Sequence, residues 1–297
     1  MIKKWNIWYN IYSNLEYEVR VLNLYEALEA LKKTGTMGQA GVYLRISQSA
    51  VSKRIAALEL VTKKKLIEKN GRRVSLTAEA EQLISKVSPL LADIRLELNT
   101  LSAPAAAELH VGVSESILAS WGAKVLWSIE NSLSPSRIVS HAHRGPLLTQ
   151  LVGSGTYLVG IIAGEPGTIG SLECIQLGRE PMVILECNAQ TDTLISIEAQ
   201  SATWQAIKRK SVKLGLVPDR FVESFFSAAS LAIAGFGKAL LPAGVTQSLK
   251  LPRNTSVKTV PGLHRPVNMV GRKHILARPD IVNMRKMFEQ QLGSMSW

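Results

Sequence analysis

A connection of only two residues, Arg45 and Ile46, joins two helical patterns near the N-terminus, and it limits the possible folds more than any other feature. Before it, Leu22–Lys33 carries apolar side chains at helical spacing, and a second, short helix is expected to end at Leu44. After it, Ser47 is a suitable N-cap for a third helix. Three short helices with so tight a turn predict a helix-turn-helix unit.

The third helix, Ser47–Glu59, has two unlike faces when its residues are placed about 100° apart. Val51, Ile55 and Leu58 form a narrow apolar stripe that must face a core. The opposite face is small, hydroxyl-bearing and sparsely charged, so it can enter the major groove of DNA closely. An ordinary solvated face is the alternative. The candidate DNA-contacting residues on this helix are Gln48, Ser49, Ser52 and Lys53.

Positive charge is concentrated around the same helix. The whole chain has a formal net charge of +12. Between Arg45 and Arg73 there are nine basic residues against two acidic ones, which leaves +7 in 29 residues. A solvated surface normally mixes both signs, so this concentration favours a nucleic-acid partner.

A hairpin signal follows the third helix. Asn70–Gly71 is a typical turn sequence between two short strand patterns. Arg72 and Arg73 stand at its tip, where a basic wing can reach the minor groove or the phosphates of DNA. The pattern therefore predicts a winged form of the helix-turn-helix unit.

A long helical pattern begins at Thr77 and keeps its apolar spacing as far as Leu98, for about six turns. Pro89 lies inside it and need only kink the helix. So long a stripe at the edge of a small domain predicts a dimerisation helix. A core helix of a single globule is the alternative.

The remaining two hundred residues follow a small-residue connector at 102–107. Strand-like runs alternate there with helical patterns to the C-terminus, which predicts an α/β domain with open, mostly parallel sheets, two of them expected. Ligands of such sheets bind in a crevice at the carboxyl ends of the strands.

Several function classes lack support in the sequence. There is no phosphate-binding glycine loop and no nucleophile elbow, and the five histidines lack the spacing of a metal site, so we expect no enzyme, cofactor or metal. Apolar runs are interrupted within about ten residues, and no secretory signal is evident at the N-terminus. Cys174 and Cys187 are expected to be buried free thiols in a reducing cytosol, so a cytoplasmic location is expected.

The segment from Leu22 to Leu98 resembles the winged helix-turn-helix and linker helix of LysR-type transcriptional regulators. Its most specific part is SQSAVSKRIAALE, followed by GRRVSLT. The resemblance implies base and phosphate contacts on the third helix, a minor-groove contact in the wing and further wing contacts at its tip. These positions are Gln48, Ser49, Ser52, Lys53, Lys69, Arg72 and Arg73.

The later segment Val222–Pro242, VESFFSAASLAIAGFGKALLP, resembles the periplasmic-binding-protein-like (type 2) effector domain of the same family. This implies a small-molecule inducer between two subdomains. The cationic capacity of His141, His143 and Arg144 favours a carboxylate, although Gly145 and Leu158 replace the usual hydroxyl and acidic residue. The candidate ligand-binding residues are Ser114, Ser116, His143, Thr203 and Ser224, with Ser201 beside them.

The expected fold class is therefore α/β overall, in four parts. They are an N-terminal extension (1–20), a mainly α winged helix-turn-helix domain (21–76), a linker or dimerisation helix with a hinge (77–104), and a two-subdomain effector domain (105–178 with 267–297, and 179–266). The expected function is that of a sequence-specific regulator of transcription that binds double-stranded DNA as a homodimer or homotetramer under the control of a co-inducer. The alternative is a DNA-binding regulator or architectural protein with a degenerate effector domain and no inducer.

Overall fold

The computed structural model describes residues 20–70, 73–102, 108–132, 137–188 and 190–295. The chain divides into two compact units, with the boundary between Leu91 and Ala92. Residues 1–19 of the predicted N-terminal extension, residues 103–107 of the predicted connector and the wing residue Arg72 lie outside the described residues.

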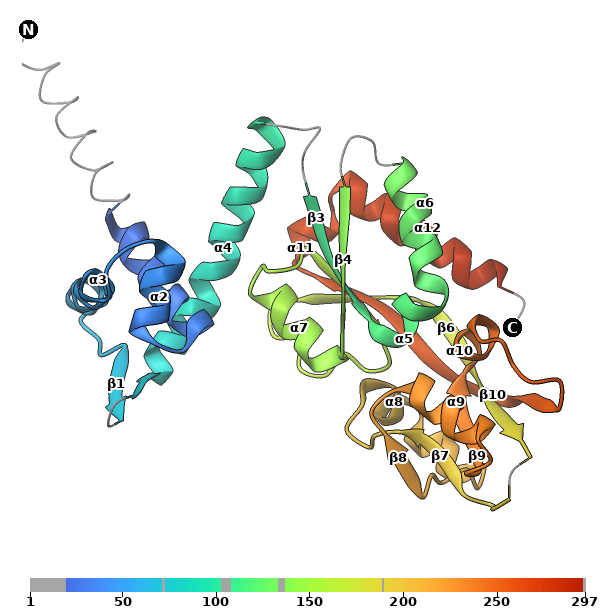
Figure 1. The fold of residues 1–297 in the computed structure, drawn as a ribbon. Helices are drawn as coiled ribbons and strands as arrows, with labels where there is room; N and C mark the ends of the chain where they lie inside the picture. The colour runs from blue at the N-terminus through green and yellow to red at the C-terminus, as the bar shows by residue number, and fades with distance from the viewer. Residues whose placement is uncertain (1–19, 71–72, 103–107, 133–136, 189, 296–297) are drawn as a thin grey trace, which may run out of the picture. The chain divides into compact units, whose positions relative to one another are not determined.

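The first unit contains the predicted three helices and hairpin (Figure 1). Residues 20–34 are helical. They are followed by α2 (Met37–Leu44), α3 (Gln48–Thr62), β1 (Ile67–Asn70), β2 (Arg73–Leu76) and the start of α4 (Ala78–Ser102), which contains Pro89. The antiparallel β1–β2 pair runs from Ile67↔Leu76 to Asn70↔Arg73. The winged helix-turn-helix prediction is confirmed.

Two hydroxyl caps and one tight turn set the angle between α2 and α3. Thr36 accepts a hydrogen bond from the backbone N–H of Gln39, and Ser47 accepts one from that of Ala50. Arg45 ends α2 in the left-handed conformation, with φ 56°. A side chain at Gly41 would place its Cβ 2.7 Å from the carbonyl oxygen of Ile46, so the turn requires glycine there.

The core of the first unit is the predicted apolar stripe of α3. Val51, Ile55 and Leu58 are buried against Leu28 of the first helix and Ile84 of α4. Because α3 cannot rotate about its axis without exposing these three side chains, their burial fixes which face of the helix remains in solvent.

The second unit is built on one eight-stranded sheet, in the order β4-β3-β5-β10-β6-β9-β7-β8. The prediction of two separate sheets was wrong, because β6 and β10 are long enough to pair along both halves (Figure 1). The pairs β3–β4, β3–β5, β7–β8 and β7–β9 are parallel, as predicted. By contrast, β10 runs antiparallel to β5 and β6, and β6 runs antiparallel to β9. The strands are β3 (Glu108–Ser114), β4 (Arg137–His143), β5 (Val159–Ala163), β6 (Glu173–Cys187), β7 (Leu194–Ile197), β8 (Arg220–Val222), β9 (Lys238–Pro242) and β10 (Thr255–Gly271).

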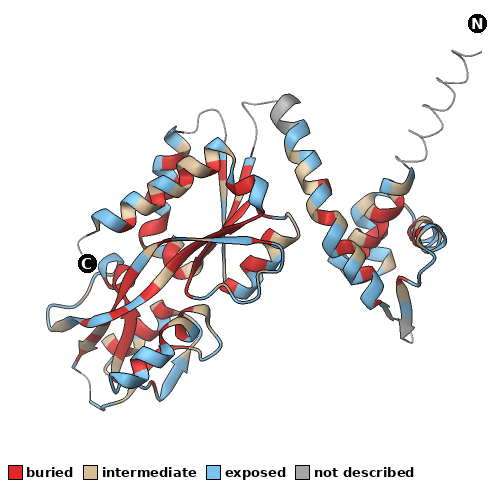
Figure 2. Ribbon diagram, turned by 180° about the vertical axis from the view of Figure 1, so that it is seen from behind, coloured by how far each residue is buried: buried red, intermediate tan, exposed pale blue. Residues whose placement is uncertain are grey.

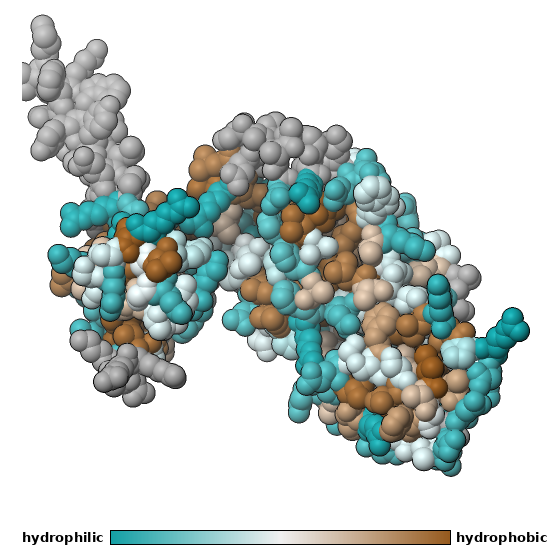
Figure 3. Space-filling model, viewed as in Figure 1, coloured by the Kyte–Doolittle hydropathy of each residue, from teal (hydrophilic) through white to brown (hydrophobic). Residues whose placement is uncertain are grey.

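Helices cover both faces of this sheet, and Figure 2 shows its central strands as buried. Across the described residues no helix is long and apolar enough to cross a membrane, and the visible surface mixes hydrophilic and hydrophobic residues (Figure 3). The helical segments are α5 (Glu115–Ile117), the π-helical η2 (Leu118–Gly122), α6 (Ala123–Ser132), α7 (Gly145–Gly153), α8 (Ala202–Lys213), α9 (Phe225–Ile233), α10 (Ala243–Ser248), α11 (Lys273–Leu276) and α12 (Pro279–Ser294).

Separate apolar cores lie on the two halves of the sheet. One includes residues between Leu109 and Leu177 together with those between Val267 and Leu292. Another contains residues from Met182 to Leu263. The change of core near 178–182 and 263–267 supports the proposed subdomain division, which places its boundaries at 178/179 and 266/267.

One thiol prediction was wrong. Cys187 is buried, but Cys174 is exposed. Cys174 lies near the start of β6, where most residues are exposed or half-buried, ahead of the buried stretch that begins at Glu180. The apolar residues Leu172 and Ile175 near Cys174 in the sequence therefore did not predict the exposure of its side chain.

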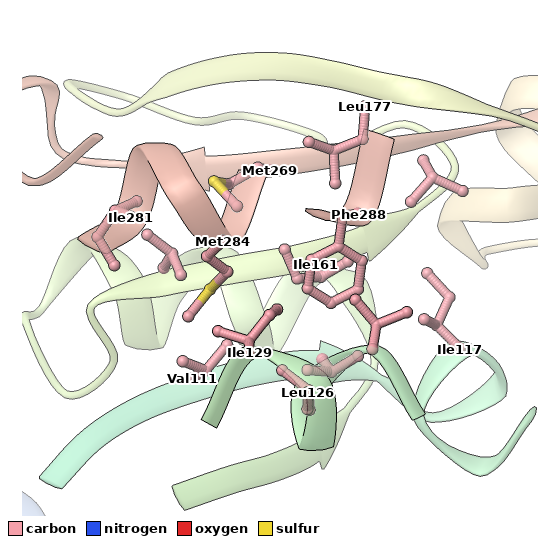
Figure 4. Packing of buried hydrophobic residues seen from close by; sticks show 14 of the residues in the cluster. Val111, Ile117, Leu126, Ile129, Ile161, Leu177, Met269, Ile281, Met284 and Phe288 are labelled. Atoms are coloured by element: carbon pink, nitrogen blue, oxygen red, sulfur yellow. The ribbon is translucent and has the colours of Figure 1, made fainter. Parts of the chain in front are cut away.

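Phe288 of α12 is the largest apolar side chain that is fully buried in the first of these cores, where it packs among side chains from α6, α12 and the sheet (Figure 4). Phe288→Ala should lower the free energy of unfolding of the second unit by about 3–5 kcal/mol, because it leaves a cavity that the packed strands cannot close. Urea denaturation followed by circular dichroism measures this. Gln290→Ala, on the exposed side of the same helix, should change it by less than about 0.5 kcal/mol, and equal losses in both variants would contradict the assignment.

Candidate nucleic-acid interface and ligand cleft

The exposed face of α3 carries the four DNA-contacting residues that the sequence predicted on this helix. Gln48, Ser49, Ser52 and Lys53 are all exposed, and Arg54 beside them is half-buried. The Ser47 and Ser49 hydroxyls are 2.9 Å apart and hydrogen-bonded, which places Ser49 at the positive end of the helix. The face is therefore small and polar, with its longest basic side chain, Lys53, in the second turn.

The wing positions are only partly described. Lys69 lies in β1 and Arg73 in β2, whereas Arg72 falls outside the described residues. These strands place both residues on the same hairpin, where Lys69 directly precedes Asn70 and Arg73 pairs with Asn70.

Between α3 and β1, the three lysines Lys63–Lys65 form a turn. Lys63 adopts the left-handed conformation, with φ 54°. Glu59 closes the turn by accepting hydrogen bonds from the backbone N–H groups of Leu66 and Ile67, at 2.8 and 3.4 Å. One of the two acidic residues of the +7 segment is therefore used to hold the turn that leads into the wing.

The second unit contains a cavity of about 350 Å³ that is lined from both halves of the sheet. One wall consists of residues 114–116, at the end of β3, and 143–147, which run from the end of β4 into α7. The other wall consists of residues 197–198 and 200–203, at the start of α8, with Glu223 and Phe225 at the start of α9. Three helices of nine residues or more therefore begin at or beside this cavity, and their N-termini favour negatively charged groups.

Four of the five predicted ligand-binding residues line this cavity, namely Ser114, Ser116, His143 and Thr203. Ser201 lines it as well and caps α8 by accepting from the backbone N–H of Trp204. Ser224 is not among the lining residues. Its hydroxyl caps α9 and donates to Glu115 Oε1 at 3.2 Å, so it acts at the edge of the cavity rather than within it.

A fully buried ion pair, which sequence reasoning missed, lies behind the cavity. Arg265 of β10 donates from Nε and Nη2 to Glu180 Oε2 of β6, at 2.9 and 2.6 Å. Its Nη1 donates to Ser116 Oγ at 2.8 Å and to Thr203 Oγ1 at 3.4 Å. Neither residue belongs to a motif, and their meeting depends on the β6–β10 register, which no local pattern encodes.

Acidic side chains of the cleft were also missed, because only hydroxyls and cations were sought there. Glu115, Glu198 and Glu223 all line the cavity. Arg144 donates to Glu198 Oε1 at 2.6 Å and to Glu223 Oε2 at 3.0 Å. The cation that was predicted to attract a carboxylate is therefore shared by two carboxylates of the protein.

His143 connects the cavity to a stack of aromatic rings from β3, β4 and the segment just before β5. Its Nε2 is hydrogen-bonded to the Tyr157 hydroxyl at 2.7 Å. Tyr157 stacks on His141, and His141 stacks on His110, with ring centroids 4.8 and 5.4 Å apart. Burial, followed by the nearby His110 and His143, lowers the pKa of His141, while burial raises the pKa of Tyr157.

Comparison with known proteins agrees with this architecture. The family described as bacterial regulatory helix-turn-helix protein, lysR family, matches residues 22–81. An HTH-type transcriptional regulator of Vibrio cholerae is 33% identical over 239 residues, which cover 76% of this chain and 80% of that relative. The chain belongs to the LysR family of transcriptional regulators.

Solved structures of LysR regulators share the fold of this family member over most of its length. CbnR, a LysR family transcriptional regulator, aligns with a TM-score of 0.64 at 17% identity, covering 91% of this chain and 98% of that one. Full-length OxyR from Pseudomonas aeruginosa aligns with a TM-score of 0.66 at 16% identity, covering 93% and 98%. CbnR has also been crystallised in complex with its target DNA.

The histidine stack predicts acid sensitivity. Because the pKa of His141 is lower in the folded chain than its ordinary value of about 6.5, the unfolded chain binds more protons as the pH falls through that value. Stability should therefore be retained above about pH 7.5 and decline below about pH 6.5. Urea denaturation at pH 7.5 and 5.5 measures the loss.

His141→Gln should reduce that acid-induced loss, since the variant has no proton to take up at this position. His264→Gln, an exposed histidine on β10, is the matched control and should leave the loss unchanged. The same loss in His141→Gln as in the original protein would show that the stack is not its cause.

Proposed function

We propose that this LysR regulator reads specific DNA sequences with the exposed face of α3 and that a small molecule in the cleft controls it. The observation that carries the proposal is the small polar face of α3 within a segment of net charge +7. Its polyanionic partner is double-stranded DNA, and the protein acts in the cytoplasm.

The candidate DNA contacts divide into two kinds. Gln48, Ser49 and Ser52 lie at the start of α3, where short polar side chains can reach base edges in the major groove. Lys53 carries the positive charge of this face and reaches a base or a phosphate. The wing residues Lys69, Arg72 and Arg73 contact the minor groove or the adjacent phosphates. CbnR, a protein of the same fold, has been crystallised with its target DNA, which supports DNA as the partner.

We further propose that α4 holds two copies of the chain together. Leu90 is 62% exposed and Ile94 is 55% exposed, and Leu98 follows at the same four-residue spacing with 56%. Such a row of large aliphatic residues in solvent marks an interface, because burial of apolar surface is what favours association. A homodimer formed through α4, or a homotetramer of two such dimers, would present paired recognition helices to DNA.

The cleft is proposed as the inducer site. Its cavity of about 350 Å³ lies within the range of small-molecule sites, about 300–1,000 Å³. Its walls offer buried hydroxyls of Ser114, Ser116 and Thr203, with His143 at one side. A degenerate effector domain without an inducer remains the alternative, but an open cavity with buried polar walls favours the ligand-controlled function.

Replacement of Lys53 tests the DNA-binding face. Lys53→Ala should weaken binding to the preferred DNA site about tenfold, which corresponds to about 1.4 kcal/mol, because it removes the main cation of the α3 face. Selection of bound fragments from genomic DNA identifies the site, and fluorescence anisotropy at several salt concentrations measures the affinity.

The controls separate charge from sequence reading. Lys86→Ala, an exposed lysine on α4, should leave DNA affinity unchanged. Ser52→Ala or Gln48→Ala should change the preferred bases more than the overall affinity. DNA affinity that is indifferent to salt would contradict the proposal, since release of counterions from phosphates requires a steep dependence.

Replacement of Ile94 tests the proposed interface. Ile94→Glu should convert the oligomer to smaller species by placing a charge where two apolar rows meet, and it should not unfold the chain because the side chain is exposed. Sedimentation equilibrium measures the mass. Ile94→Leu should keep the original mass, and an unchanged mass in Ile94→Glu would exclude α4 as the interface.

A further inference from the structure

Two buried hydroxyl groups in the cleft each accept one hydrogen bond from the protein. Ser114 Oγ accepts from the backbone N–H of Ala163 at 3.0 Å, and Ser116 Oγ accepts from Arg265 Nη1 at 2.8 Å. Both side chains line the cavity and are only 8% and 6% exposed. Within the described residues neither hydroxyl has an acceptor for its own hydrogen, so each can donate to a molecule in the cavity.

Arg265 fixes the direction of its hydrogen bond with Ser116. Its guanidinium has no lone pair to offer, so Ser116 can only accept from it. Glu180, fully buried as well, holds the guanidinium in place. The third hydroxyl differs, because Thr203 donates to the carbonyl oxygen of Ala163 at 3.2 Å and has no hydrogen left for a ligand. The deep wall therefore presents the hydrogens of Ser114 and Ser116, which suit a carboxylate.

Glu115, between these two serines, presents the opposite chemistry to the same cavity. Its carboxylate accepts from the Ser224 hydroxyl at 3.2 and 3.5 Å. In the described part of the chain no Lys, Arg or His lies within ion-pair distance of it, in contrast to Glu198 and Glu223, which share Arg144. Three carboxylates and a single guanidinium line the cavity, with His143 beside them, so the lining has a surplus of negative charge that a cationic ligand group can balance.

We infer that the cleft binds an amino-acid-like zwitterion, with its carboxylate on Ser114 and Ser116 and its ammonium group on Glu115. A ligand with a carboxylate alone would bring two negative charges together at Glu115, and an amine alone would leave the buried hydroxyl hydrogens without an acceptor. The inference rests on the proposed function, because it names the ligand chemistry of the same cleft.

The test uses full-length protein and three matched sets of probes: the twenty common amino acids, the corresponding acids without the amino group, and the corresponding amines without the carboxylate. Thermal shift finds the probes that bind, and isothermal titration calorimetry measures their affinity. At least one amino acid should bind, and removal of its ammonium group or its carboxylate should weaken binding tenfold or more.

Variants assign these effects to residues. Glu115→Gln should weaken binding of the amino acid about tenfold and strengthen binding of its deaminated analogue, because the variant removes the repulsion between the two carboxylates. Ser116→Ala should weaken both. Glu173→Gln, which removes an exposed carboxylate of β6 outside the cavity lining, is the matched control and should keep the original preference for the amino acid. Circular dichroism confirms that each variant is folded.

The inference is overturned if the deaminated acid binds as tightly as the amino acid, if Glu115→Gln leaves the preference unchanged, or if no probe binds. Its failure is distinguishable from failure of the proposed function. A plain carboxylate that binds and is lost in Ser116→Ala would keep the cleft as the inducer site while excluding a zwitterion. The DNA-binding proposal is tested separately by Lys53→Ala and the salt dependence.

Discussion

Arg265 and Glu180 face each other across the β6–β10 ladder, with both side chains completely removed from solvent. A buried ion pair contributes little net stability, but loss of one partner leaves an uncompensated charge in the interior. The pair therefore acts as a constraint. It fixes the register of the two strands that join the halves of the sheet, and through Ser116 and Thr203 it fixes one polar group on each wall of the cleft.

The first unit could be predicted almost entirely from the sequence, because its signals are local. The caps Thr36 and Ser47, the two-residue turn and the stripe of Val51 and Ile55 each act within one or two helical turns. The alternation of strands and helices in the second unit was equally readable. Its single sheet was not, because periodicity identifies a strand without revealing its partner, and β6 and β10 are joined by pairs up to 98 residues apart, such as Glu173↔Gly271.

The cleft shows the same limit at the level of side chains. Ser114, Ser116 and Thr203 were predicted because they follow strands or begin helices, and resemblance to the family supplied their positions. The acidic character of the cavity could not be predicted in this way. Nothing in the sequence distinguishes Glu115 and Glu198 from ordinary exposed residues. Only the folded chain shows that Arg144 forms ion pairs with two carboxylates. It also shows that Glu115 has no ion-pair partner among the described residues.

The crossing between the halves of the sheet consists of two adjacent hydrogen-bonded strands, β6 and β10, and their pairing shifts register between Thr259 and His264, close to the buried pair. Paired strands resist separation but twist readily, and an irregularity in the ladder concentrates that twist. The two walls of the cleft can therefore rotate relative to each other by twisting of β6 and β10, and the hydrogen bonds between these strands oppose a large rotation. A ligand that contacts both walls would change their relative rotation by a small angle, and long, stiff elements convert a small rotation into a large displacement at their far ends.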